Sequence, residues 1–203
     1  MLTIKIIGKG GKLLMSESGT DICAHYDAEY SEGDVIRIES AADNYVFLKL
    51  DEAVSGSIVL MPHRSFEFSV PFGGVRAACF GNEAFSGDSH VISAHELPES
   101  EIYAYRNIAL NPYDCHGRAK GFPHATANFV TREEPCFYER NAIDGVCQNE
   151  SHGGFPYHSW AGGAREDLDY RIDFGGETEV DKIVFFLRAD FPHDTYWKSI
   201  DVE

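Results

Sequence analysis

The stretch Val35-Ile36-Arg37-Ile38-Glu39 alternates apolar and polar side chains, so that Ile36 and Ile38 share one face and Arg37 lies on the other. A two-residue repeat of this kind is typical of a β-strand with one buried face. The same repeat recurs at residues 45–50, 66–70 and 170–174, whereas 3.6-residue periodicity is almost absent. The sequence therefore predicts an all-β fold with under a tenth of its residues in helix, and one helical turn at 136–143.

Turn-forming residues divide the chain between these strands. Glycine, proline, asparagine and aspartate cluster at residues 32–34, 42–44, 71–74 and 175–176, and short strands at such spacing favour a sandwich or barrel. Leu97-Pro98-Glu99-Ser100 has the composition of a linker. We therefore expect two β units that meet near residues 99–106: a smaller sandwich-like domain over 1–100, whose role the sequence does not indicate, and a second over 106–203.

The composition limits the partners of the chain. Its 203 residues carry 33 acidic and 17 basic side chains, a formal net charge of −16. Nucleic acids and anionic lipids attract clusters of Lys and Arg, so this acidic protein is expected to bind neither. No feature of the sequence indicates an oligomeric state.

The first residues, 1–8, have the alternation of a short strand and lack the apolar core of a secretory signal. No stretch approaches the ~18 apolar residues of a membrane-spanning helix, so no membrane insertion is expected. The sequence as it stands predicts a cytoplasmic protein, or an extracellular one if a leader has been trimmed. Five scattered cysteines without a CxxC pair predict buried, reduced thiols and neither a disulfide framework nor a cysteine zinc site.

Five segments of the second half carry the one recognisable pattern, and they follow in the order 106–112, His124-Ala125-Thr126-Ala127-Asn128, 140–145 with Ser159-Trp160, 169–175 and 180–188. In this order they resemble a galactose-binding-like domain of the discoidin (coagulation factor 5/8 type C) family. The resemblance implies a β-sandwich of the jelly-roll type, with strands at 106–112 and 180–188, and lectin-like carbohydrate binding. Domains of that family are longer than residues 106–203, so this one is expected to be C-terminally incomplete or completed by strands of the first half.

The resemblance also implies a structural calcium ion at the loop 141–145, with Asp144 and Asn141 as candidate ligands. A tight Asp-Gly turn, as at Asp144-Gly145, directs carbonyl oxygens and a carboxylate toward one point, and calcium prefers such oxygens. The alternative is an ordinary turn in which Asp144 accepts hydrogen bonds from its own backbone.

Two segments contain residues suited to a sugar site. Residues 187–197 supply Arg188, Asp190, His193 and Trp197, and residues 152–160 supply His152, Tyr157 and Trp160. A sugar is bound by a flat aromatic face against its C–H surface and by charged or amide groups at its hydroxyls. We expect the first four residues to form one side of an open site, opposed by Trp160 or Tyr157.

Each of these residues also has a structural interpretation. Trp160 suits a core position at the start of a strand, and Arg188 and Asp190 suit a simple ion pair. His152 and His158 suit hydrogen bonding within their loop. A zinc site would require His152, His158 and His193 to converge.

These patterns favour a non-catalytic carbohydrate-binding protein, for a galactose-like or related glycan. The first alternative is a polysaccharide lyase or hydrolase that uses Tyr157, His158, His193 and Asp194 as acid and base. The second is a protein-interaction sandwich with its aromatic side chains in a hydrophobic patch.

Overall fold

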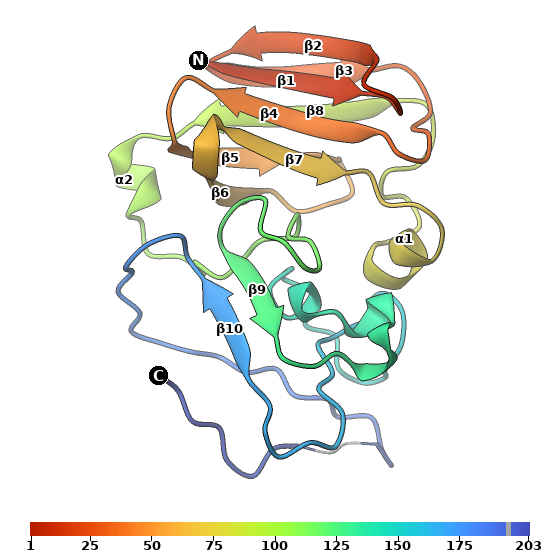
Figure 1. The fold of residues 1–203 in the computed structure, drawn as a ribbon, viewed down its shortest axis with the longest axis vertical. Coiled ribbons are helices and arrows are strands. Elements are labelled where there is room, and N and C mark those ends of the chain that lie inside the picture. Colours follow the sequence, from red (N-terminus) through yellow and green to blue (C-terminus); the bar gives the residue numbers. More distant parts are fainter. Residues whose placement is uncertain (194–195) are drawn as a thin grey trace.

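The structure is a computed structural model that describes residues 1–193 and 196–203. Its first half holds eight antiparallel strands in two four-stranded sheets, of order β2-β1-β4-β7 and β3-β8-β5-β6 (Figure 1). The strands are β1 (Leu2–Ile7), β2 (Leu13–Gly19), β3 (Asp21–Tyr26), β4 (Val35–Ser40), β5 (Asn44–Lys49), β6 (Ser57–Met61), β7 (Ser65–Ser69) and β8 (His90–Glu96). The expected mostly β class is confirmed.

The alternation at residues 35–39 sets the faces of the first sheet. Ile36 and Ile38 of β4 are fully buried and lie opposite buried isoleucines of β1. Arg37 lies on the other face, where its Nε donates a hydrogen bond of 2.7 Å to Glu67 of the neighbouring strand β7. The hydrophobic repeat therefore fixes which side of the sheet is buried, because a shift of one residue would expose both isoleucines.

The buried faces of both sheets contribute to one hydrophobic core. Burying one such side chain contributes roughly 1.5–3 kcal/mol relative to leaving it in water. Fully buried members come from both sheets and include Leu2, Ile4, Ile6, Ile36, Ile38, Val46, Leu48, Val59, Ile92 and Ala94.

The helical segments are short, and the longest has seven residues. They are α1 (Gly73–Cys79), α2 (Glu99–Ile102) and the 3-10 turns η1 (Pro62–Arg64), η2 (Thr131–Glu133), η3 (Pro135–Phe137) and η4 (Glu139–Ala142). They make the protein 12% helical, which corrects the expectation of under a tenth. The excess comes from segments such as α1, which begins inside the Pro71–Gly74 stretch that we interpreted as a turn. The expected turn at 136–143 coincides with η3 and η4.

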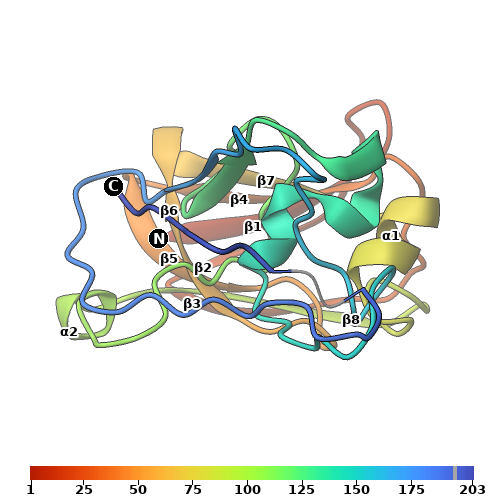
Figure 2. The ribbon, with the colours of Figure 1, turned by 90° about the horizontal axis from the view of Figure 1, so that it is seen from below.

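Helices α1 and α2 lie at opposite ends of the two large sheets (Figure 2). Within residues 1–193 and 196–203, the structure contains no helix with the length and apolar character needed to cross a membrane.

The second half contains a two-stranded antiparallel sheet of β9 (His124–Ala127) and β10 (Tyr170–Asp173). Ile172 pairs with the fully buried Ala125, and Asp173 pairs with His124. Two of the five segments that suggested a discoidin-type domain therefore form strands, and these strands pair with each other.

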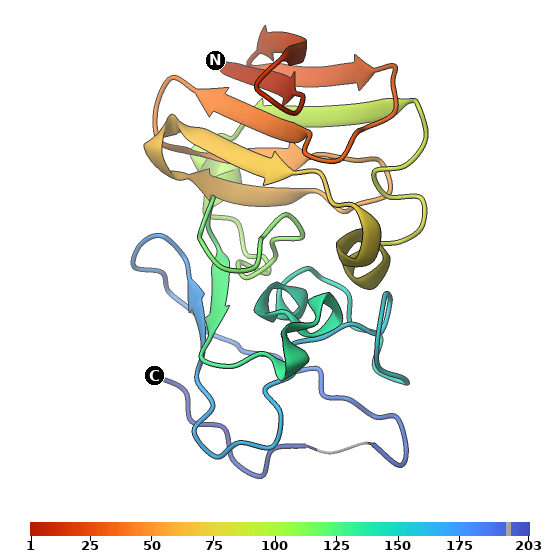
Figure 3. The same ribbon diagram turned by 45° about the vertical axis from the view of Figure 1, so that its right-hand side comes forward.

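The strands expected at 106–112 and 180–188 are not formed in the described structure, which corrects both predictions. In the first segment the chain turns, and the N–H of Asn111 donates to the carbonyl of Ile143 at 2.7 Å. The second runs as an extended trace away from both large sheets (Figure 3), with Val184 56% and Phe186 64% exposed. A strand forms only where a neighbour accepts its ladder of hydrogen bonds, and no described strand pairs with this segment.

The boundary expected near residues 99–106 falls on α2 and the exposed Tyr103 and Tyr105 that follow it. Beyond it, the second half contacts the first through several hydrogen bonds. Leu60 of β6 and Phe122 exchange backbone hydrogen bonds of 2.9 and 3.0 Å. The N–H of Leu50 donates to the hydroxyl of Tyr113 at 3.0 Å, and the Tyr113 ring is part of the core of the first half. The division into two domains stays a prediction, and the two halves are docked together.

All five cysteines are unbridged in the structure. Cys79 is buried as expected and its thiol donates to the carbonyl of Pro135, but Cys23 and Cys147 are exposed, which corrects the expectation of buried thiols. Burial raises the pKa of the Cys115 thiol to about 11. That the chain needs no disulfide for stability stays a prediction.

Candidate functional site

Two loops that are far apart in the sequence meet at Asn149. Its side-chain amide donates a hydrogen bond of 2.8 Å to the carbonyl of Leu187, and its own carbonyl accepts one of 2.9 Å from the N–H of Ala189. These two bonds hold residues 187–189 beside the loop that contains His152. Asn149 bonds the residues on either side of Arg188. The residues that follow Asn149 and Ala189 in the sequence therefore come close together.

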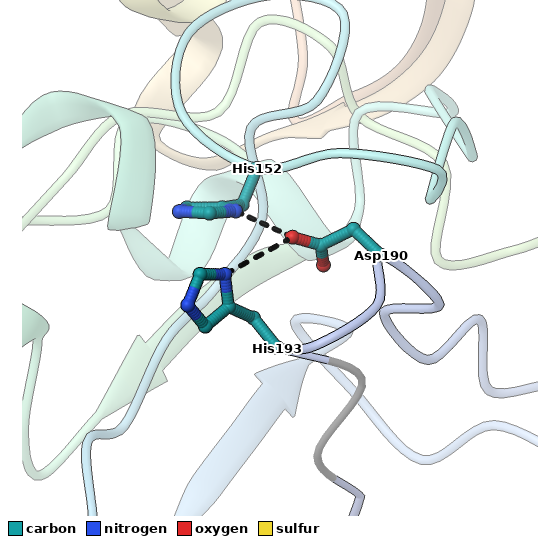
Figure 4. Close-up of side chains that lie close together, drawn as sticks. All are labelled: His152, Asp190 and His193. Atoms are coloured by element: carbon teal, nitrogen blue, oxygen red, sulfur yellow. Dashed lines mark hydrogen bonds and ion pairs between the residues drawn. The ribbon is translucent and has the colours of Figure 1, made fainter.

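His152, Asp190 and His193 form a compact cluster at this junction (Figure 4). The Nδ1 of His152 lies 2.6 Å from Oδ2 of Asp190, and the Nδ1 of His193 lies 3.9 Å from the same oxygen. The two imidazole rings meet edge to face, with centroids 5.2 Å apart. In Figure 4 the second nitrogen of each ring points away from Asp190. The carboxylate therefore holds the His152 ring by a hydrogen bond and lies within ion-pair distance of the His193 ring, and each ring presents its Nε2 to its surroundings.

Arg188 completes the cluster and also closes the turn. Its Nε lies 2.6 Å from Oδ1 of Asp190 and donates to the carbonyl of His193 at 2.7 Å. The N–H of His193 donates to the carbonyl of Asp190 at 2.6 Å. These bonds define the backbone over residues 188–193, so the side chains of the cluster project from a closed loop.

Asp190 is the centre of the cluster, with a side chain that is 11% exposed. Burial alone would raise the pKa of the Asp190 carboxyl, but the hydrogen bond from His152 and the charge of Arg188 hold that pKa below its usual range. The carboxylate is therefore ionised at neutral pH and attracts the N–H groups of both imidazoles.

Trp197 and Trp160 form a separate aromatic group. Their ring centroids are 5.5 Å apart, and Trp160 also contacts the ring of Tyr170 at 4.8 Å. The indole N–H of Trp160 donates to the carbonyl of Phe129 at 3.0 Å, which anchors a partly buried ring that begins no strand. The structure thus brings Trp197 beside Trp160, as the sequence allowed. Among the described residues, no hydrogen bond or ion pair joins Trp197 to Arg188 or Asp190.

A different aromatic side chain adjoins the polar cluster. Phe191 follows Asp190 directly and is 88% exposed. Phe191 was not among the residues that the sequence predicted to bind a sugar. The signal available was its place between Asp190 and His193, two residues that were already candidates. Asn149 was also missed, because the partner of its amide is a backbone carbonyl that the sequence does not identify.

The loop expected to bind calcium is occupied by protein donors. Asp144 accepts hydrogen bonds from the N–H of Val146 at 2.9 Å and from Nε2 of His158 at 2.5 Å. The guanidinium of Arg140 lies 3.7 Å from the same carboxylate and donates to the side-chain oxygen of Asn141 at 3.0 Å. Both oxygens of Asp144 already accept hydrogen bonds from the protein, and calcium requires such oxygens as ligands, so this loop does not fit a calcium ion. The arrangement is instead the Asx turn that was the alternative interpretation.

The residues of the enzymatic alternative are dispersed. His158 is buried and its Nε2 bonds Asp144, so it lies in a different network from His193 and does not join a three-histidine zinc site. Tyr157 is partly buried, and its backbone N–H donates to the carbonyl of Gly154. Asp194 lies outside the described residues.

A second group of potential metal ligands and two surface hollows also lie within the described structure. Asp51, Glu52 and His90 lie close enough for metal binding, but both oxygens of the buried Asp51 accept backbone N–H groups, at 2.8 Å each. Two surface hollows of about 230 and 250 Å³ lie beside η1 and beside Tyr30, and neither is lined by the candidate residues. Both histidines of the polar cluster around Asp190 are exposed, and this cluster is the strongest candidate.

The chain matches no protein-family model, no curated protein and no solved structure. The resemblance of residues 106–203 to discoidin-type domains therefore rests on the sequence segments alone.

Proposed function

We propose that this protein binds a carbohydrate, without catalysis, at the polar cluster formed by Arg188, Asp190, His152 and His193. The observation that supports the proposal most is the hydrogen bond of 2.6 Å between His152 and Asp190, which joins two loops into one exposed polar surface. End loops carry recognition in many β proteins while strands hold the scaffold.

The groups offered to a sugar are the outer edges of the two imidazoles and the remaining N–H groups of Arg188. Each Nε2 either donates or accepts a hydrogen bond, depending on the tautomer, and so suits a hydroxyl in either role. A guanidinium donates two parallel hydrogen bonds to neighbouring oxygens. Asp190 serves mainly as the positioning residue, because its oxygens already contact Arg188 and His152.

Phe191 supplies the apolar face that a sugar ring requires. Its ring is 88% exposed and belongs to the same turn as Asp190 and His193. An aromatic ring packs against the C–H surface of a pyranose while the polar groups bond its hydroxyls. In this proposal Phe191 takes the role that the sequence suggested for Trp197, and Trp197 with Trp160 extends the surface for a longer glycan.

The proposal includes the finer fold assignment for the second half, a galactose-binding-like β-sandwich. It is supported by the antiparallel pairing of β9 with β10, which are two of the expected strands. An open surface with few contacts predicts weak binding, roughly millimolar to tens of micromolar, or about 4–7 kcal/mol.

The test is a glycan array on the purified protein, followed by titration of the best glycan. Phe191→Ala and Arg188→Lys should each weaken binding at least about tenfold, or about 1.4 kcal/mol. Arg165→Ala is the matched control, because Arg165 also pairs with an aspartate and lies over an aromatic ring, at Asp167 and Phe129. Binding that both Phe191→Ala and Arg188→Lys leave unchanged would contradict the proposed site.

A second candidate function, protein interaction, is favoured by the exposed apolar segment 180–186. Val180, Ile183, Val184, Phe185 and Phe186 are each at least half exposed, and exposed apolar stretches on extended backbone promote strand pairing. We name a second copy of the chain as the partner, because antiparallel self-pairing centred between Val184 and Phe185 places Asp181 opposite Arg188. Light scattering over a wide concentration range should then show a dimer that Phe186→Lys abolishes. A monomer at every concentration would exclude this candidate.

A further inference from the structure

His152, Asp190 and His193 offer three ligand atoms that all lie within 4.8 Å of one another (Figure 4). Two of the three are imidazole nitrogens and one is a carboxylate oxygen. This donor set suits divalent transition metals, because imidazole binds zinc, copper, nickel and iron whereas calcium and magnesium require more oxygen ligands.

We propose that His152, Asp190 and His193 bind one divalent transition-metal ion, with zinc as the ion to test. Zinc takes histidine nitrogen and aspartate oxygen at about 2.0–2.2 Å. Three protein ligands leave a coordination position open, as in zinc sites that also bind water or a further ligand. The metal site goes beyond the proposed carbohydrate binding and does not depend on it.

The observed spacing requires only a small adjustment to admit the ion. Ligand atoms of a tetrahedral zinc site lie roughly 3.3 Å apart, as the bond lengths imply. The Asp190 oxygen lies 2.6 Å from the His152 nitrogen and 3.9 Å from the His193 nitrogen, so displacements of less than about an ångström bring each imidazole to that spacing from the carboxylate. The side chains of His152 and His193 are 40% and 59% exposed, so each has room to rotate toward the ion.

The groups around the three ligands leave Oδ2 of Asp190 as the oxygen that faces a metal. Arg188 forms an ion pair with Oδ1 of Asp190, whereas both histidines face Oδ2. Outer partners of a ligating carboxylate orient it, and the Arg188 ion pair takes that role here without a hydrogen bond to Oδ1. The bonds of Asn149 to Leu187 and Ala189 hold the two loops together before any metal binds. The site is thus assembled by the protein, so less ordering is needed on binding.

The experiment is calorimetric titration of zinc chloride into tag-free, metal-free protein. One zinc per chain is expected. His152→Ala and His193→Ala should each weaken the affinity by more than about 100-fold, since the loss of an outer-shell partner alone costs about 10–100-fold. Both side chains are exposed, so these variants should keep the parental melting transition.

Two control variants change potential ligands that lie outside the proposed metal site. His25→Ala removes an exposed histidine of β3, which lies 3.4 Å from Asp27. Glu52→Gln alters the second group of potential ligands, with Asp51 and His90. Both variants should bind zinc as the parent does. Absence of binding at millimolar zinc, or affinity that neither His152→Ala nor His193→Ala changes, would overturn the metal site.

These measurements distinguish a failure of the metal proposal from a failure of the carbohydrate proposal. Zinc titration requires no glycan, and the glycan array can be repeated on chelated protein. Zinc binding with a blank array supports the metal site alone. Glycan binding by chelated protein that takes up no zinc supports the carbohydrate site alone.

Discussion

The side-chain amide of Asn149 donates to the carbonyl of Leu187 at 2.8 Å, across 38 residues of sequence. The return bond, from the N–H of Ala189 to the carbonyl of Asn149, closes a two-point junction between the loops. His152 and Asp190 each follow this junction by a few residues, so their contact depends on it. The geometry of the candidate site therefore depends on Asn149 as well as on the residues that form the cluster.

Asn149→Ala should loosen the junction while leaving the sheets intact. The variant loses one hydrogen bond, worth about 0.5–1.5 kcal/mol of unfolding free energy, and the loop 187–193 should become more accessible to hydrogen exchange. Asn82→Ala is a control at an asparagine of the first half. Unchanged exchange in 187–193 would show that Asn149 does not hold the loop.

Asp144→Ala should destabilise the protein by about 3 kcal/mol. The side chains of Arg140, Asp144 and His158 are each at most about 5% exposed, and removing one partner of a buried charged group leaves the other uncompensated. Denaturant unfolding measures the change.

Because the Asp144 carboxylate already accepts two hydrogen bonds, adding calcium to the metal-free protein should leave the melting temperature unchanged. A ligand that binds only the native state raises the melting temperature. A rise that requires Asp144 would restore the calcium site that the sequence suggested.

The stability of the protein should fall as the pH rises above 6.5, because of His124. Its Nδ1 lies 2.7 Å from Asp114 and its Nε2 lies 2.9 Å from the carbonyl of Gly117, so both nitrogens face acceptors. The hydrogen bond that His124 donates to Asp114 raises the pKa of His124 above its usual 6.5, against the opposing effect of burial. A raised pKa means that the protonated form stabilises the fold fully below pH 6.5, and that this contribution is lost as the pH rises through the folded-state pKa.

His124→Gln should remove this pH dependence, as urea unfolding of both proteins from pH 6 to 9 would show. The parent and the variant should differ most at the acidic end of that range. Parallel stability curves for the two proteins would contradict the assignment of the effect to His124.

Tyr113→Phe should weaken the attachment of the second half to the first. The variant removes the hydroxyl that accepts a hydrogen bond from the buried N–H of Leu50, and an unsatisfied buried group costs about 1–3 kcal/mol. Tyr103→Phe, at an exposed ring, is the control. A single cooperative unfolding transition in the parent, retained at lower stability in Tyr113→Phe, would show that the halves unfold together.

The alternation of Ile36 and Ile38 was enough to predict the strand class, because one-sided burial imposes a two-residue repeat. Strand β2 (Leu13–Gly19) lacks that repeat and is largely exposed, so its pairing with β1 leaves no trace in its hydrophobic pattern. Helix α1 was not predicted because it begins with Gly73 and Gly74, and adjacent glycines commonly mark turns. Residues 180–188 are apolar enough for a core strand, yet burial depends on a partner strand that the segment itself does not specify.

The candidate site was predicted in part for similar reasons. Arg188, Asp190 and His193 lie within six residues, so their proximity followed from the sequence, and the structure confirms that they contact one another. The approach of His152 depends on a long-range bond of Asn149 to the backbone. The packing of Trp197 against Trp160 is likewise a contact that spacing along the chain does not reveal.

The most direct test of the carbohydrate site is to follow the imidazole signals of all nine histidines by NMR while the glycan selected on the array is added. The account predicts that the signals of His152 and His193 shift in a saturable manner, and that His25 and the buried His158 stay in place. Phe191→Ala should suppress those shifts at the same glycan concentration. Shifts that leave His152 and His193 untouched, while the glycan demonstrably binds, would contradict the account and place the sugar elsewhere on the protein.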